Sequence, residues 1–137
     1  MEQNNSVLLS KNVYSQIMYE CKMGLPNEAC GLLSGCGNRC KTVWPMKNME
    51  PTPFSFVMDI QEQDMTFDMI KRRNERFVGI YHSHPFGVAV PSYDDVIHAL
   101  YPDTFYFVIS VGHRSAELKC YKIYKGKVKH VEVIITD

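Results

Sequence analysis

The sequence of 137 residues contains no apolar stretch near the roughly 20 residues that a membrane-spanning helix needs. It has no excess charge either, because 15 Lys and Arg residues balance 15 Asp and Glu residues. A neutral chain gives no electrostatic reason to expect nucleic acid or an anionic membrane as a partner. The first ten residues, MEQNNSVLLS, carry neither the basic nor the apolar segment of a secretory signal. These absences favour a cytoplasmic protein that binds neither nucleic acid nor membranes.

Cysteine is present in an odd number, five, which together with the missing signal predicts reduced thiols and no disulfide framework. Cys36 and Cys40 flank an expected turn at a spacing seen in zinc sites, but no second pair of ligands accompanies them. A cysteine nucleophile is disfavoured, because no histidine is close in sequence and no feature that would stabilise a thiolate is evident. Any role of these two cysteines stays open.

The chain shows no repeat, low-complexity tract or linker, which predicts one domain over residues 1–137. Three helices are expected, each beginning after an N-cap residue, at Ser10, Asp59 and Ser92. The first should end near residue 24, the second at 71–73 and the third at residue 100. The apolar face of the second helix is predicted to consist of the following residues: Ile60, Phe67 and Ile70, with Met65 and Met69 beside them.

Short apolar and β-branched runs separated by turn residues predict the strands. They are expected at residues 7–9, 28–34, 41–46, 54–58, 77–82, 104–111, 116–124 and 128–135. Gly112 is expected to make the turn between two of the last three strands. Strands and helices in this order predict an α/β fold with a mixed, mainly antiparallel sheet and about three helices.

A pair of histidines, His82 and His84, lies at the end of the expected central strand. Side chains two residues apart on a strand point to the same face, so both imidazoles can bind one ion. Pro85 and Pro91 bound a loop that can return the chain toward them.

Ser92 begins a helix after this loop, and Asp95 lies one turn into it on the same helix face. A carboxylate there could be a third metal ligand, which would leave a fourth tetrahedral position open, as in catalytic zinc sites. Hydrolysis also needs a base outside the ligand set. Glu28 is the best candidate, because it precedes the buried run Ala-Cys-Gly-Leu-Leu.

Each of these residues has a plainer interpretation when it is taken alone. A histidine in an apolar strand is usually a hydrogen-bonded core residue. Ser92 and Asp95 could simply cap a helix and complement its dipole, and Glu28 could be a surface residue. The interpretation changes because His-x-His, the proline-bounded loop and Ser-x-x-Asp occur together within 14 residues, from His82 to Asp95.

Together these residues resemble the signature of the JAMM (MPN+) zinc metalloproteases: Glu, a gap, His-Ser/Thr-His, seven residues, Ser-x-x-Asp. The segment Pro-Asn-Glu-Ala-Cys-Gly-Leu-Leu-Ser-Gly is similar to the one that carries the family's glutamate, and the order of elements matches over nearly the whole chain. The resemblance implies a cytidine-deaminase-like fold and one Zn²⁺ held by His82, His84 and Asp95. It implies that Glu28 is the general base and then acid, and that Ser92 is the oxyanion donor.

The short chain is similar to the standalone prokaryotic branch of this family. That resemblance implies a peptidase or isopeptidase acting at the C-terminal Gly-Gly end of a ubiquitin-like sulfur-carrier protein, which a narrow groove could accept as a thin, extended tail. Two alternatives were weighed. A catalytically silent MPN-type scaffold is disfavoured because all ligands are present, and a small-molecule zinc hydrolase or deaminase because a Pro-Cys-x-x-Cys pair is missing.

Overall fold

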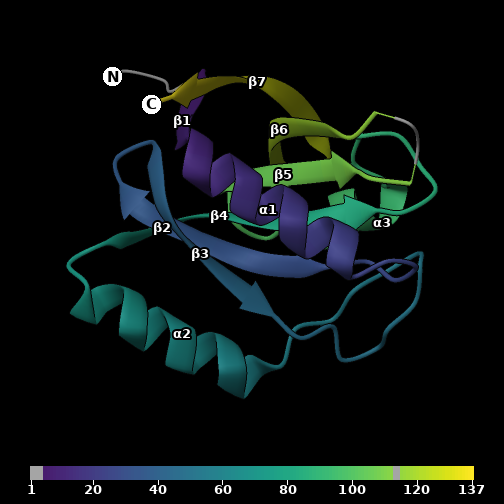
Figure 1. Cartoon of the computed structure of the whole chain (residues 1–137), viewed down its shortest axis with the longest axis horizontal. Helices are drawn as coiled ribbons and strands as arrows, with labels where there is room; N and C mark the ends of the chain where they lie inside the picture. Colours follow the sequence, from purple (N-terminus) through teal and green to yellow (C-terminus); the bar gives the residue numbers. More distant parts are fainter. Residues whose placement is uncertain (1–4, 113–114) are drawn as a thin grey trace.

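The computed structural model describes residues 5–112 and 115–137, and this part of the chain forms seven strands and three helices (Figure 1). The elements follow one another as β1 (Ser6–Ser10), α1 (Lys11–Met23), β2 (Cys30–Cys36), β3 (Arg39–Met46), α2 (Ile60–Arg72), β4 (Arg76–His84), α3 (Tyr93–Ile97), β5 (Phe105–Ser110), β6 (Glu117–Tyr124) and β7 (Lys127–Thr136). The predicted α/β fold with three helices is confirmed.

Hydrogen bonds link the strands in the order β1-β3-β2-β4-β5-β6-β7, and β7 also pairs with β1, so the sheet closes on itself. The pairs β1–β3, β1–β7 and β4–β5 are parallel and the other four are antiparallel, as the predicted mixed, mainly antiparallel sheet requires. The closure itself was not predicted, since no local pattern reports that the first and last strands pair. The strand order places β4, which carries both histidines, between β2 and β5.

The core lies mainly between α1 and the curved sheet, because α1 packs across it (Figure 1). The helix begins at the predicted N-cap, where the Ser10 hydroxyl accepts a hydrogen bond from the Val13 amide at 3.1 Å. It buries Val13, Ile17, Met18 and Cys21. A second apolar cluster, around Leu32 and Met46, lies on the side of α2. Apolar packing on both sides therefore fixes the central strands β2 and β4.

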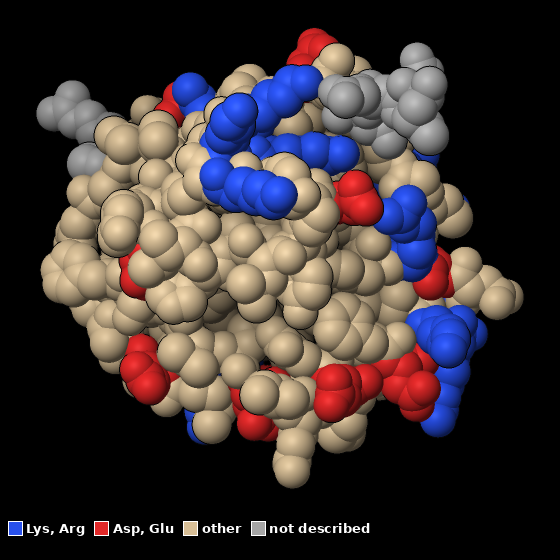
Figure 2. Space-filling view, turned by 180° about the vertical axis from the view of Figure 1, so that it is seen from behind, with Lys and Arg blue, Asp and Glu red and all other residues tan. Residues whose placement is uncertain are grey.

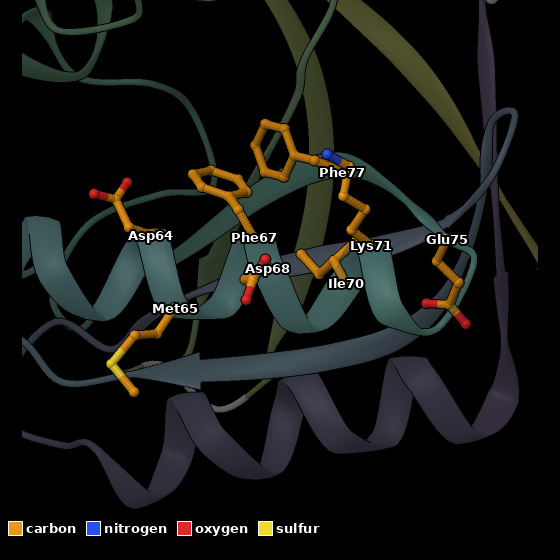
Figure 3. Close-up of a pocket in the computed structure, with 8 residues that line it drawn as sticks. All are labelled: Asp64, Met65, Phe67, Asp68, Ile70, Lys71, Glu75 and Phe77. Carbon is orange, nitrogen blue, oxygen red and sulfur yellow. The ribbon is translucent and has the colours of Figure 1, made fainter.

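The predicted apolar face of α2 is wrong except at Ile70, which is buried. Ile60 is 71% exposed and Met65 66% exposed, while Phe67 and Met69 are exposed as well. Only Thr66 and Ile70 are buried in this helix, because the line on which it packs runs through them. A helix with apolar residues on several sides does not reveal which side meets the sheet. Met65 and Phe67 border a groove of about 570 Å³ between α2 and the start of β4 (Figure 3).

Residues 54–58, predicted as a strand, belong to an irregular loop between β3 and α2. Their alternation of aromatic and polar residues is typical of strands, but the backbone of this loop bonds within itself. The amides of Phe54 and Ser55 donate to the hydroxyl of Thr52, and the amide of Val57 donates to the side chain of Asn48. Two polar side chains thus take the place that a neighbouring strand would have.

The third helix is shorter than predicted and ends at Ile97 instead of residue 100. The backbone leaves helical geometry at His98, with φ −96° and ψ 1°. The ring Nδ1 of His98 lies 2.9 Å from the carbonyl oxygen of Asp94 and donates to it, which satisfies one group at the helix end. The predicted strand at residues 28–34 also begins later, at Cys30, so that Glu28 precedes it.

The loop after the histidines passes close to the end of β5. Gly112 lies against the backbone carbonyl of Pro85, and a Cβ atom there would collide with it. This glycine is therefore required for close packing. The rest of the turn predicted here falls on residues 113–114, which lie outside the described residues.

Charge is unevenly distributed although it cancels overall. Lys and Arg gather along one edge of the back face, at the β6–β7 hairpin, and Asp and Glu along the opposite edge near α2, where a second group of Lys and Arg lies at the end of the helix (Figure 2). Within residues 5–112 and 115–137, no helix has both the length and the apolar character that crossing a membrane demands.

Candidate metal centre

The two histidines lie at the C-terminal end of β4, where hydrogen bonds to the neighbouring strands β2 and β5 hold the backbone. His82 is paired with Cys30 of β2 and Val108 of β5, and His84 is paired with Ser110. Their side chains are only 5% and 11% exposed. The two Nε2 atoms lie 3.1 Å apart, so the predicted common face of the two imidazoles is present.

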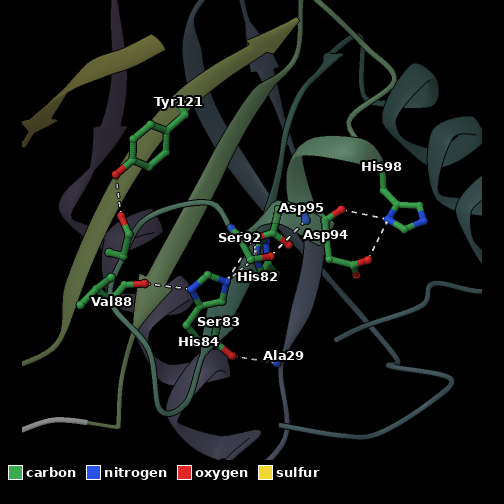
Figure 4. Close-up of polar contacts among 11 residues, drawn as sticks. Ala29, His82, Ser83, His84, Val88, Ser92, Asp94, Asp95, His98 and Tyr121 are labelled. Atoms are coloured by element: carbon green, nitrogen blue, oxygen red, sulfur yellow. Dashed lines mark hydrogen bonds and ion pairs between the residues drawn. The ribbon is translucent and has the colours of Figure 1, made fainter. Parts of the chain in front are cut away.

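Asp95 reaches the histidines from α3, as the loop between the two prolines allows (Figure 4). Its Oδ2 lies 3.1 Å from Nε2 of His82 and 3.1 Å from Nε2 of His84. The same oxygen accepts a hydrogen bond from the Ser92 amide at 2.8 Å, which closes a capping box. The short helix therefore aims the carboxylate at the two rings.

The hydrogen bonding of His84 indicates that a cation belongs between these three side chains. Its Nδ1 lies 2.8 Å from the carbonyl oxygen of Val88, which can only accept, so Nδ1 carries the proton. The Nε2 of His84 then presents a lone pair to His82 and Asp95. Ligand atoms about 2.0–2.1 Å from a tetrahedral ion lie about 3.3 Å apart, close to the 3.1 Å separations here. The donor set fits a metal ion.

Electrostatics within the group stabilise the ionised form of the Asp95 carboxyl. Burial acts to raise the pKa of Asp95, but hydrogen bonds with His82 and His84 outweigh it and hold that pKa well below its ordinary value. Burial acts to lower the pKa of His84, yet its contacts with Asp95 and with the Val88 carbonyl raise it overall. Among the described residues, this is the group of three or more potential ligands whose atoms lie within 4.8 Å of one another.

Glu28 lies beside this group: Cys30 pairs with His82, the Ser83 amide donates to the Ala29 carbonyl, and the charges of His84 and Asp95 act on the Glu28 carboxyl. The residue is 5% exposed. Its Oε1 has no hydrogen-bond partner among the described residues. Burial raises the pKa of Glu28 to about 8. A buried carboxyl with an unused oxygen next to a potential metal site is suited to carrying a proton.

Ser92 is the N-cap of α3, and its hydroxyl oxygen accepts a hydrogen bond from the Asp95 amide at 3.1 Å. The predicted helix-cap role is therefore present. Because the oxygen acts as acceptor in this contact, the hydroxyl proton can still be donated to another group. The capping contact and the predicted oxyanion role are compatible.

Sequence reasoning assigned no role to two residues that shape the site. Ser83, between the histidines, accepts from the Ala29 amide at 2.8 Å and donates its own amide to the Ala29 carbonyl at 3.0 Å, which ties the neighbour of Glu28 to β4 (Figure 4). The ring of Phe56 stacks on the imidazole of His82, with centroids 4.8 Å apart and planes at 27°. The position of Ser83 in the motif could have indicated its role, whereas no sequence signal places Phe56 there.

The cysteines form no comparable group. All five are free, and Cys36 is exposed while the other four are buried. Cys40 lies in the main apolar core. A shared metal for Cys36 and Cys40 thus finds no support in their surroundings.

The strand and helix that meet at two histidines and an aspartate place a set of potential metal ligands in an α/β fold, and comparison with known proteins gives the family of the chain. The family described as prokaryotic homologs of the JAB domain matches residues 10–124. The chain belongs to this family, which confirms the resemblance noted from the motif.

Individual relatives agree with this assignment. The chain is 36% identical to the CysO-cysteine peptidase of Mycobacterium tuberculosis over 116 residues, covering 82% of this chain and 79% of the relative. It is 33% identical to the desampylase of Haloferax volcanii over 93 residues, covering 65% and 66%. The solution structure of protein DSY2949 from Desulfitobacterium hafniense superposes with a TM-score of 0.87 at 31% identity, over 96% of this chain and 93% of that one.

Proposed function

We propose that this single-domain protein is a zinc-dependent peptidase of the JAMM type that hydrolyses the amide bond after the C-terminal Gly-Gly of a ubiquitin-like sulfur-carrier protein. The observation that carries the proposal is the convergence of three ligand atoms, from His82, His84 and Asp95, next to the buried carboxyl of Glu28, whose Oε1 has no hydrogen-bond partner among the described residues. The peptidase and the desampylase among the relatives favour this class of reaction and substrate.

His82, His84 and Asp95 would hold the zinc ion, which supplies a Lewis acid that makes a water molecule more acidic. Glu28 would take the proton of the attacking water and pass it to the leaving amine. The Ser92 hydroxyl would donate a hydrogen bond to the tetrahedral oxyanion. Every one of these roles uses a group that the fold already places at one end of β4.

The surroundings of the site suit an extended tail of small residues. Phe54, from the loop before α2, and Phe86, from the loop after the histidines, are both exposed, and their ring centroids are 6.4 Å apart. Val88 and Tyr93 add further exposed apolar surface on the other loop and helix. A Gly-Gly segment has no side chains that would collide with such a rim.

The test is cleavage of a ubiquitin-like sulfur-carrier protein carrying a cysteine or a short peptide after Gly-Gly, with zinc content measured in the same samples. Glu28→Gln keeps the size of the side chain but cannot take a proton, so the rate should fall about 10²–10⁴-fold with zinc retained. Ser92→Ala should keep zinc and lose roughly 10²–10³ in rate, while Ser92→Thr should restore most of it. Cleavage by Glu28→Gln at the wild-type rate would refute the mechanism.

A further inference from the structure

Glu28 lies beside the sheet but outside its strands. The next residue, Ala29, is bonded to Ser83 of β4, whereas the backbone groups of Glu28 itself pair with the loop between β3 and α2. The Glu28 amide donates to the Thr52 carbonyl at 2.8 Å, and its carbonyl accepts from Nδ2 of Asn48 at 3.0 Å. Since the Oε1 atom of its side chain lacks a partner among the described residues, these two loop contacts contribute directly to its position.

Asn48 is the centre of this loop. Besides Glu28, its Nδ2 donates to the Ser55 carbonyl at 3.1 Å, and its Oδ1 accepts from the amides of Glu50 and Val57 at 3.1 and 3.0 Å. These two donated and two accepted bonds occupy both N–H groups and both acceptor lone pairs of the Asn48 side-chain amide. A carboxylate could not donate the bonds to the Glu28 and Ser55 carbonyls. One side chain therefore ties both ends of the loop to the backbone of Glu28.

The same loop reaches the metal-binding group. Phe56 lies between two residues bonded to Asn48, Ser55 and Val57, and its ring covers the imidazole of His82. On the other side, Asn48 and Glu28 both line a cavity of about 300 Å³. A displaced Glu28 would find free space there instead of a wall, so its place depends on the hydrogen bonds.

We propose that Asn48 is a positioning residue that holds Glu28 at the distance from the two histidines that proton transfer requires. The inference rests on the proposed function, in which Glu28 is the general base. Reacting groups must be held closely, and a misplacement of about 1 Å by a distant mutation can cost about 10² in rate. Partners that orient active-site groups typically contribute about 10–100-fold to metal affinity or activity.

Asn48→Asp tests this, because it keeps the two accepted bonds and removes the two donated ones. The expected result, with the Gly-Gly fusion as substrate, is a kcat lowered about 10–100-fold, an unchanged KM and a full complement of zinc. Asn38→Asp is the matched control: its Nδ2 also donates to a backbone carbonyl, that of Ser6, at 2.9 Å, in the turn between β2 and β3. It should leave kcat unchanged.

A double-variant comparison separates positioning from general loosening. In the Glu28→Gln background, Asn48→Asp should cost almost nothing further, because its effect acts through the proton carried by Glu28. The same loss in both backgrounds, or a loss of zinc that accompanies the loss of kcat, would overturn the proposal. Should the introduced charge unfold the loop, Asn48→Gln keeps both donors but moves them by one methylene, and a smaller loss of the same pattern is expected.

Hydrogen exchange gives a readout that needs no substrate. The Glu28 amide, bonded to Thr52, should exchange several-fold faster in Asn48→Asp than in wild type and remain slow in Asn38→Asp. Unchanged exchange at Glu28 would count against Asn48 as its anchor even if cleavage falls. If wild type cleaves no Gly-Gly fusion, the proposed function fails, and this measurement still decides whether Asn48 positions Glu28.

Discussion

The candidate metal site joins two regions that are stabilised in different ways. The strand region, with His82 and His84 on β4, is bonded to β2 and β5 on its two sides and packed against the core. The helix region consists of the N-cap Ser92 and the five residues of α3, which include Asp95. All five are described and none of them is buried. A single oxygen, Oδ2 of Asp95, contacts both histidines and the Ser92 amide.

The difference indicates which of the two regions a bound cation would stabilise. Sheet hydrogen bonds and buried apolar side chains hold the two imidazoles without any help from an ion. Five residues are too few to form a helix by themselves, so α3 relies on its capping box and on the contacts of Asp95. We expect a bound cation to stabilise the helix region strongly and the strand region little. The following predictions test this, from the largest expected effect to the smallest.

Replacing Asp95 should have the largest effect. Asp95→Ala removes a ligand and half of the capping box, so zinc affinity should fall at least about 100-fold and α3 should lose protection. Competition with a chelator measures the first, and amide exchange at residues 93–97 the second. The control is Asp94→Ala, since Asp94 is exposed and its Oδ1 lies 3.5 Å from His98. Equal zinc loss in both variants would contradict the assignment.

Glu28→Gln should stabilise the metal-free protein at alkaline pH. Burial raises the pKa of Glu28 from its ordinary 4.5 to about 8. Below pH 4.5 the carboxyl is protonated in the folded and the unfolded chain, so the two proteins should differ little. Between pH 4.5 and about 8, only the unfolded chain releases the proton readily, so wild-type stability falls as the pH rises. Glutamine stays neutral, so at pH 8 the variant should be more stable than wild type by several kcal/mol.

Chemical unfolding of both proteins in chelator, from pH 4 to pH 9, measures this difference. A constant difference across the range would mean that Glu28 ionises as freely when folded as when unfolded. A variant that becomes less stable than wild type at high pH would contradict the sign of the effect.

Ser92→Ala should cost about 1 kcal/mol of stability, the usual value of an N-cap. The loss should be concentrated in α3, because none of its residues is buried and its contact with the core is that of Val96 with the cluster around Val108. Local amide exchange should therefore rise at residues 93–97 and stay constant along β4. Faster exchange in β4 as well would mean that the two regions are coupled more tightly than their packing indicates.

The smallest effect is expected for thiol reactivity. Removal of the metal should leave the reactivity of the cysteines in the strand region unchanged. Cys30 is buried next to the site, and burial raises its pKa to about 12. Burial also raises the pKa values of Cys21 and Cys40 to about 12. At pH 8, a thiol reagent should modify exposed Cys36 quickly and the other four only after denaturation, with or without chelator. Rapid labelling of Cys30 in the metal-free protein would contradict the expectation that the strand region stays folded without the metal.

Local patterns were enough for much of this architecture. N-caps at Ser10, Asp59 and Ser92 are where the sequence predicts them, because capping depends on residues only a few positions apart. The shared face of His82 and His84 follows from the alternation of side chains along a strand. The spacing of the motif was sufficient to bring Asp95 into the prediction as well.

The sequence by itself therefore determined the α/β class, the order of most elements and the residues that converge at the candidate metal site, since each depends on short-range periodicity or spacing. Only the tertiary structure decided that the sheet closes, that Thr66 joins Ile70 as a buried residue of α2 while Ile60 and Phe67 stay exposed, and that residues 54–58 form no strand. It also placed Asn48 against the backbone of Glu28, 20 residues away in sequence. Such contacts depend on which polar groups the folded chain brings within hydrogen-bonding distance, and no local pattern records that.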